Sequence, residues 1–272
     1  MNSVMYGKNG SIRLRVRTFN DRLPMITVGV MALITVIGFF LLDGKGVSFF
    51  GGLAKTGRDL GVMFAKPAFK HLTLAETGHQ MAVTLSLSFL TTILGAVIAL
   101  FLALAAARNL ARGPFGPFLK GFIAVVRAVP TVLWVLIFAV GAGLGAVAAV
   151  VGMVFHTVGY LLKAYSESYE EIDAGVIEAL RASGASWWQI VFQAVFPASM
   201  TAILSWTFIR FEINFVTAVA MGAAAGAGGI GFDLFMASSF YFDLREVGSI
   251  TWAILALAIA LEAAGERMKR SF

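Results

Sequence analysis

The chain of 272 residues contains no cysteine, only three histidines and few charged side chains. The missing cysteines exclude disulfides, thiolate metal sites and thiol catalysis. His71, His79 and His156 are scattered and form no metal-binding pattern, so we expect no metal, no cofactor and no catalytic residue. Charged residues make up 13% of the chain, whereas soluble domains carry about 25%.

The sequence contains several long apolar runs with few charged residues. Hydrophobic residues make up 59% of the chain, and a membrane-spanning helix needs about 20 largely apolar residues. The sequence therefore predicts an all-α integral membrane bundle of about six transmembrane helices. A tight turn at 141–145 separates the third from the fourth. The predicted spans are 24–42, 80–107, 121–140, 146–162, 198–221 and 247–264.

The distribution of Lys and Arg predicts the orientation. Residues 1–23 form a basic N-terminus, and 24–42 suit an uncleaved anchor better than a signal peptide, because the run ends in Leu42-Asp43-Gly44-Lys45 without a small-residue cleavage site. If both termini are cytoplasmic, including the tail 265–272, the inside segments hold twice as many Lys and Arg as the outside segments. The net charge of +6 then reflects membrane loops and not nucleic acid binding.

Residues 43–79, on the predicted outside, carry most of the outside charge. Their apolar residues Leu53, Leu60, Met63 and Phe64 recur at helical spacing, with charged residues between them. An interfacial helix on the outer membrane face and an ordinary loop both fit this pattern. The remaining predicted parts are a core at 80–264 and, within it, a loop at 166–197.

The loop 166–197 has a fixed internal spacing. Glu178-Ala179-Leu180 is followed after three residues by Gly184, and after nine more by Ala194-Val195-Phe196-Pro197. Gly184 suits a turn with a positive φ, and Pro197 suits the first turn of the next span. From Trp187 onward the loop is too apolar to stand free, which favours a short helix pressed into a partner's groove. An amphipathic loop without a partner is the alternative.

This spacing resembles the EAA loop of ABC-importer permeases. Glu178, Ala179, Gly184 and Pro197 match that family's pattern, whereas Leu180, Ala194 and Phe196 depart from its commonest residues. In the family the loop is the coupling helix that docks on the ATPase subunit. The resemblance implies that five residues couple the chain to an ATPase, namely Glu178, Ala179, Gly184, Trp187 and Pro197.

Further stretches resemble phosphonate permeases, and the similarity covers about residue 81 to the C-terminus. They are Arg127-Ala128-Val129-Pro130, the runs 156–163 and 210–214, and the glycine-rich run 226–232. The resemblance implies a type I ABC importer permease fold, a second permease copy, two ATP-binding subunits, an extracytoplasmic solute-binding protein, and phosphonate, phosphate or phosphite as cargo. One departure is Val216, where these permeases often carry a second arginine. The chain has no Gly-x4-Gly-Lys-Ser/Thr motif, so ATP would bind to the partners.

Charged residues inside predicted spans are candidates for the translocation path, because each costs about 2.5–3.5 kcal/mol at the bilayer centre. Three of them are singled out: Arg127, Arg210 and Glu212. Arg127 could instead snorkel to the cytoplasmic interface. Arg210 could attract an oxyanion, or it could pair with a buried acid such as Glu212 of a second copy.

Gly226, Gly228 and Gly231 fit the pattern Gly-x-Gly-x-x-Gly, with Gly229 between them. A dinucleotide site requires a preceding strand, whereas a membrane span precedes these glycines. Tight turns or a gate near the outer ends of the spans are therefore the expected roles.

Three other functions remain open. An ion-driven secondary transporter would need no ATPase-docking loop, and an ABC permease could carry another small anionic solute. An intramembrane enzyme would need clustered acid–base or nucleophilic residues at membrane depth, and the predicted spans show none.

Overall fold

The computed structural model describes residues 19–41, 46, 48–111 and 113–271, and these residues form helices and turns without a strand. The predicted all-α class is confirmed. The chain divides into two compact units, 1–57 and 58–272, which are described separately below. Most of the predicted basic N-terminus, residues 42–45 and Arg112 lie outside the described residues.

The first unit contains helix α1 (Phe19–Leu41), which begins five residues before the predicted first span. Its large apolar side chains are exposed from Leu23 to Leu41. The hydroxyls of Thr27 and Thr35 donate to the carbonyls of Leu23 and Met31 one turn earlier, which satisfies them within an apolar surrounding. Helix α1 is thus built for contact with lipid or with another apolar surface.

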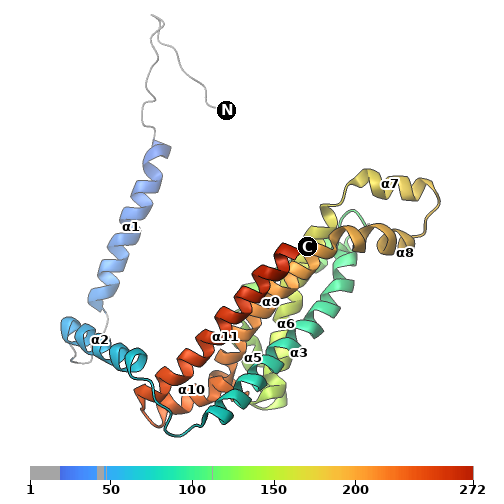
Figure 1. Cartoon of the computed structure of the whole chain (residues 1–272). Coiled ribbons are helices and arrows are strands. Elements are labelled where there is room, and N and C mark those ends of the chain that lie inside the picture. The colour runs from blue at the N-terminus through green and yellow to red at the C-terminus, as the bar shows by residue number, and fades with distance from the viewer. Residues whose placement is uncertain (1–18, 42–45, 47, 112, 272) are drawn as a thin grey trace, which may run out of the picture. The chain divides into compact units, whose positions relative to one another are not determined.

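Four long helices form the second unit: α3 (Leu74–Ala106), α6 (Ala146–Glu170), α9 (Phe196–Ala225) and α11 (Leu244–Ser271). They pack side by side (Figure 1). In the described part of the whole chain, five helices are long and apolar enough to cross a membrane, and the number reaches six if one bent pair counts as a span. The predicted number of spans is therefore confirmed on that count.

The bent pair corrects the third predicted span. Residues 121–140 are not one helix but parts of α4 (Phe115–Ala128) and α5 (Thr131–Ala142), which meet at 93°. Pro130 lies at the break because proline lacks an N–H and clashes with the preceding turn. Val129 before it adopts an extended conformation, as proline requires of its neighbour.

Small residues let these helices pack closely. A Cβ on Gly152 of α6 would lie 2.6 Å from the Cα of Val135 in α5, and a Cβ on Gly222 of α9 would lie 2.7 Å from the carbonyl oxygen of Gly228. Helix pairs in membranes approach through such residues. Gly226, Gly228 and Gly229 have φ values of 63°, 81° and 72°, so the glycine-rich run forms the tight turn between α9 and α10 (Ile230–Ser239).

Residues 43–79 contain helix α2 (Phe49–Ala65), which crosses the boundary between the two units. The predicted helical spacing therefore corresponds to a helix. In its second half, Phe64 packs edge-on against Trp252 of α11, with ring centroids 5.8 Å apart. Its location at a membrane interface remains a prediction.

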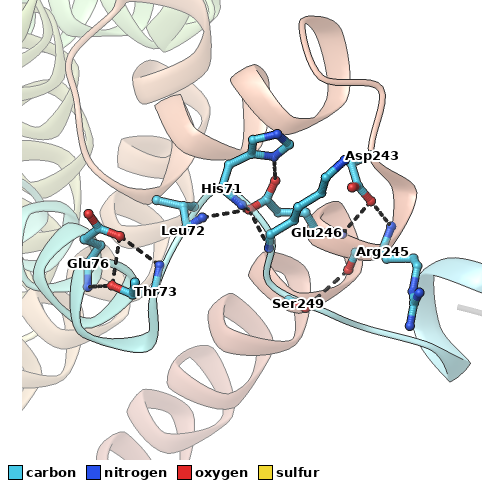
Figure 2. A network of polar contacts seen from close by, with 9 residues as sticks. His71, Leu72, Thr73, Glu76, Asp243, Arg245, Glu246 and Ser249 are labelled. Atoms are coloured by element: carbon cyan, nitrogen blue, oxygen red, sulfur yellow. Dashed lines mark hydrogen bonds and ion pairs between the residues drawn. The ribbon is translucent and has the colours of Figure 1, made fainter.

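Glu246, in the first turn of α11, fixes the segment before α3. Its Oε1 accepts hydrogen bonds from the backbone N–H groups of His71 (2.7 Å) and Leu72 (2.9 Å), and its Oε2 lies 2.6 Å from Nδ1 of His71 (Figure 2). The side chain of Arg245 donates to the carbonyl of Lys66 at 2.9 Å. These bonds hold the segment against the start of α11.

Candidate functional site

The predicted turn of the loop is present at Gly184. Helix α7 (Ala174–Ala182) begins at Asp173, whose side chain accepts the N–H of Gly175 at 2.8 Å. It ends where Gly184 adopts a φ of 84° and donates to the carbonyl of Arg181 at 3.0 Å. A side chain at this φ is strained, whereas glycine is not.

After this turn the chain forms one continuous helix in three parts: α8 (Trp187–Ile190), the π-helical turn η1 (Val191–Val195) and α9. Ser186 and Gln189 form a capping box at its start. Pro197 lies in the first turn of α9, as predicted. Pro197 has no N–H and therefore cannot form a backbone hydrogen bond to the preceding turn. The π-helical turn just before it changes the local hydrogen-bond pattern of the helix.

Five residues of this region form an exposed surface at one end of the second unit, which we call the coupling surface: Glu178, Ala179, Trp187, Trp188 and Phe192. The side chains of Trp188 and Phe192 are 53% and 58% exposed, and their rings stack with centroids 5.9 Å apart. Exposed aromatic groups of this kind are typical of protein interfaces.

A cavity of about 870 Å³ separates α7 from the start of α9. Ala179 lines it on one side, and Ala194 and Pro197 line it on the other, so the two halves of the predicted loop pattern face each other across it. Helix α7 is anchored beside this cavity by Ile177, which is 2% exposed.

The turn that follows α3 contacts α7 and α8, a feature that the sequence did not suggest. Nε1 of Trp187 donates to the carbonyl of Leu110 at 3.1 Å, and the guanidinium of Arg181 donates to the carbonyl of Asn109 at 3.1 Å. Asn109 in turn donates to the carbonyl of Tyr169 at 2.7 Å. Helices α7 and α8 are therefore hydrogen-bonded to the turn after α3, and this turn is hydrogen-bonded to the end of α6.

An ion pair supports the same turn. Nζ of Lys120 in α4 lies 2.6 Å from Oε1 of Glu170, the last residue of α6. The same oxygen accepts the backbone N–H of Arg108 at 2.7 Å. The turn after α3, helix α4 and the end of α6 thus meet at a single carboxylate.

Arg210 lies halfway along α9 and is 2% exposed. Its Nε donates to the hydroxyl of Thr157 at 3.2 Å, and its Nη2 lies 3.0 Å from Nδ1 of His156. Its guanidinium carbon lies 5.2 Å from the ring centroid of Tyr160. All three partners come from α6, and all are neutral or basic.

Arg127, the second predicted path arginine, approaches the same tyrosine. Its guanidinium carbon lies 5.9 Å from the ring centroid of Tyr160, and its side chain is exposed. In the described part of the chain, neither Arg127 nor Arg210 forms an ion pair with a carboxylate. We call Arg127, His156, Tyr160 and Arg210 the basic group.

Glu212 is not part of the basic group. Its carboxylate lies beside Gly265 of α11, on a different side of α9 from the α6 partners of Arg210. Val216, which stands at the family's second arginine position, is 64% exposed.

A buried amide extends the basic group toward α3. Nδ2 of Asn214 donates to the hydroxyls of Thr92 at 2.8 Å and Thr157 at 3.1 Å, and Asn214 is fully buried. The sequence analysis contains Thr157 and Asn214 in the runs 156–163 and 210–214 but assigns a site role to neither of them, and it does not mention Thr92. A signal was present, because Asn214 follows Arg210 by four residues and so lies on the same helix face.

The family of the chain follows from its sequence. Residues 95–270 match the family model described as binding-protein-dependent transport system inner membrane component. The phosphite transport system permease protein PtxC of Stutzerimonas stutzeri is 34% identical over 191 residues, which cover 70% of this chain and 68% of that protein.

Other relatives differ in size and in their named cargo. The phosphate-import permease protein PhnE of Mycolicibacterium smegmatis is 33% identical over 184 residues, which cover 66% of this chain but only 34% of that protein. The chain thus spans about a third of that relative. The methionine import system permease protein MetP of Bacillus subtilis is 29% identical over 113 residues, which cover 39% of this chain and 50% of that protein.

Solved structures share the fold. An inward-facing MetNI methionine ABC transporter chain aligns with a TM-score of 0.64 at 20% identity, over 75% of this chain and 99% of that chain. A bacterial ABC transporter chain involved in alginate import aligns with a TM-score of 0.64 at 13% identity, over 93% and 98%. The chain therefore has the type I ABC importer permease fold and belongs to the family of multi-pass inner membrane components of binding-protein-dependent transport systems.

Proposed function

We propose that this chain is the permease subunit of an ATP-driven importer that carries phosphonate, or the related phosphite and phosphate, by alternating access. The basic group is the observation that carries the cargo class. Two guanidinium groups converge on Tyr160, and neither forms an ion pair with a carboxylate of the described residues. The guanidinium fork suits bidentate contact with an oxyanion. The named cargo of the phosphite and phosphate relatives supports the same class.

The two arginines differ in access, which suggests an order of contact. Arg127 is exposed, whereas Arg210 is enclosed between α6 and α9. In this proposal an oxyanion meets Arg127 first and reaches Arg210 when the helices rearrange. Glu212 shapes the packing of α9 beside α11. Gly226, Gly228 and Gly229 form an outer tight turn that takes part in gating, and Gly231 follows in the first turn of α10.

The coupling surface is proposed to dock on an ATP-binding subunit, through Glu178, Ala179 and Trp187, with Gly184 and Pro197 fixing its backbone. Its exposed aromatic rings and its contacts to the turn after α3 support this role. In this proposal, docking on the ATP-binding subunit displaces several helices together.

The proposed assembly holds two copies of this chain, two ATP-binding subunits and one extracytoplasmic solute-binding protein. One chain presents one coupling surface, so an importer with two ATP-binding subunits needs a second permease chain. Both termini and the coupling surface lie in the cytoplasm, as the distribution of Lys and Arg predicts.

The ligand of the solute-binding protein tests the cargo class. We expect that protein, purified and analysed by mass spectrometry, to hold a phosphonate, phosphite or phosphate, and we expect the same compounds to compete for uptake in cells. A different small anion would leave the permease role intact and replace the cargo. Uptake that proceeds without any co-purifying ATPase would favour an ion-driven transporter instead.

A further inference from the structure

A second cavity, of about 160 Å³, is lined by residues of α10 and of the start of α11. These elements stand at the end of the second unit away from α7 and α8 (Figure 1). The cavity lies between His71 before α3, Phe232 and Asp233 of α10, and Tyr241 and Glu246 around the start of α11. Solute pockets usually measure about 300–1,000 Å³. This one is closer to the size of a single side chain.

The two carboxylates of the cavity differ in their partners. Both oxygens of Glu246 have partners within the chain. Oε1 accepts hydrogen bonds from three backbone N–H groups, and Oε2 contacts Nδ1 of His71 (Figure 2). Oδ2 of Asp233, by contrast, is buried and accepts no hydrogen bond from the residues that the structure describes. A buried acceptor without a donor is destabilising, and more so when it is charged. Asp233 is therefore open to a donor from a partner.

The negative charge around the cavity indicates that the missing donor is a cation. Among the described residues, no lysine or arginine lines this cavity. Arg245, one nearby cation, is bound to the carbonyl of Lys66, and its guanidinium points away from His71 (Figure 2). Burial, together with the carboxylates of Glu76 and Glu246, raises the pKa of the Asp233 carboxyl. The cavity thus favours a cation and repels an oxyanion cargo.

Three consecutive aromatic residues precede α11, and the middle one, Tyr241, lines the cavity. Phe240, Tyr241 and Phe242 are 64%, 48% and 79% exposed, and Tyr241 stacks on His71 with ring centroids 4.0 Å apart. Phe242 has a φ of 51°, a conformation that bulky residues rarely adopt and that occurs at functional sites. An acidic cavity next to exposed aromatic residues has the features of a protein-binding hot spot.

We propose that this cavity receives a lysine or arginine side chain of the solute-binding protein, which pairs with Asp233 while the three aromatic residues contact the surrounding surface. The inference rests on the proposed function, because it takes this end of the chain to be extracytoplasmic. The family is defined by dependence on such a binding protein. An ammonium or guanidinium donating to Oδ2 of Asp233 would satisfy the buried acceptor and form a charge-assisted bond.

The test uses the assembled transporter in nanodiscs and its own purified solute-binding protein. Asp233→Asn removes the charge without changing the shape, and Asp59→Asn is the matched control, since Asp59 of α2 does not line the cavity. We expect Asp233→Asn to raise the Kd for the binding protein at least tenfold and to weaken its salt dependence. Asp59→Asn should stay within twofold. ATPase activity without the binding protein should be unchanged in both.

A charge reversal sharpens the result. Asp233→Lys should weaken docking further, and one Lys→Glu or Arg→Glu variant of the binding protein should restore it. Equal affinity of Asp233→Asn and wild type overturns the inference. So does a loss of wild-type docking on adding EDTA, which would assign a divalent cation to His71, Asp243 and Glu246. If the wild-type transporter binds no solute-binding protein, the proposed function itself fails. A change in the variants alone tests only the docking inference.

Discussion

Arg210 is a buried cation whose described neighbours are neutral or basic. Placing its charge at membrane depth costs about 2.5–3.5 kcal/mol. Hydrogen bonds to a charged group contribute about 1.5–3 kcal/mol each, and Arg210 contacts Thr157, His156 and the ring of Tyr160. These contacts are enough to hold the charge without an acid, so the charge remains available to an anion.

Arg210→Gln tests this availability at the residue scale. Glutamine can still donate to Thr157 or His156 but carries no charge, so we expect the complex to assemble and uptake to fall at least tenfold. Glu212→Gln is the control, because Glu212 lies beside α11 and should keep most of the uptake. Near-normal uptake by a stably assembled Arg210→Gln complex would contradict the account.

The pairing alternative for Arg210 has its own test. Arg210→Ala combined with Glu212→Ala should not recover uptake, because the two side chains face different helices within the chain. Recovery of expression and uptake in the double variant would instead show that Arg210 pairs with Glu212 of the second copy.

At the scale of elements, Gly184 controls the direction of the chain between α7 and α8. A Cβ at this position meets nothing within 4 Å, so a substitution acts through the φ of 84° alone. Asparagine tolerates this region better than a β-branched residue does. We expect Gly184→Val to lower uptake and the ATPase stimulation by loaded binding protein, whereas Gly184→Asn keeps most of both. Equal behaviour of the two variants would remove the turn from the coupling mechanism.

The carboxylate of Glu170 joins three helices near the coupling region, which gives a graded prediction. Glu170→Gln keeps an oxygen for Lys120 and for the N–H of Arg108, so its unfolding temperature should stay close to wild type. Lys120→Met loses one contact, and Glu170→Leu loses both. We expect stability and uptake per ATP to fall in that order. Glu170→Leu behaving like Glu170→Gln would show that this junction transmits nothing.

Local features of these elements could be predicted from the sequence, whereas their neighbours could not. Gly184 and Pro197 lie where expected because turns and helix starts depend on nearby residues. The bend at Pro130 was missed because the third span was inferred from apolar length, although proline marked the break. Asn214 meets Thr92, 122 residues away, and only the packing of α3 against α9 decides such a contact.

On the scale of the whole molecule, the two ends of the second unit are predicted to lie on opposite sides of the membrane. The chain lacks cysteine, so single introduced cysteines can be labelled without background. We expect Ser186→Cys to resist an impermeant thiol reagent in intact cells and to react in inverted vesicles. Tyr241→Cys, at the other end, should react in intact cells. Labelling of Ser186→Cys from outside would reverse the proposed orientation.

The most direct test of the central proposal is uptake by proteoliposomes that contain this chain, its ATP-binding subunits and its solute-binding protein. The account predicts accumulation of radiolabelled phosphonate, phosphite or phosphate that requires both ATP and the binding protein and that Arg210→Gln abolishes. Oxyanion uptake driven by an ion gradient without ATP, or ATP-driven uptake that excludes all three oxyanions, would contradict it.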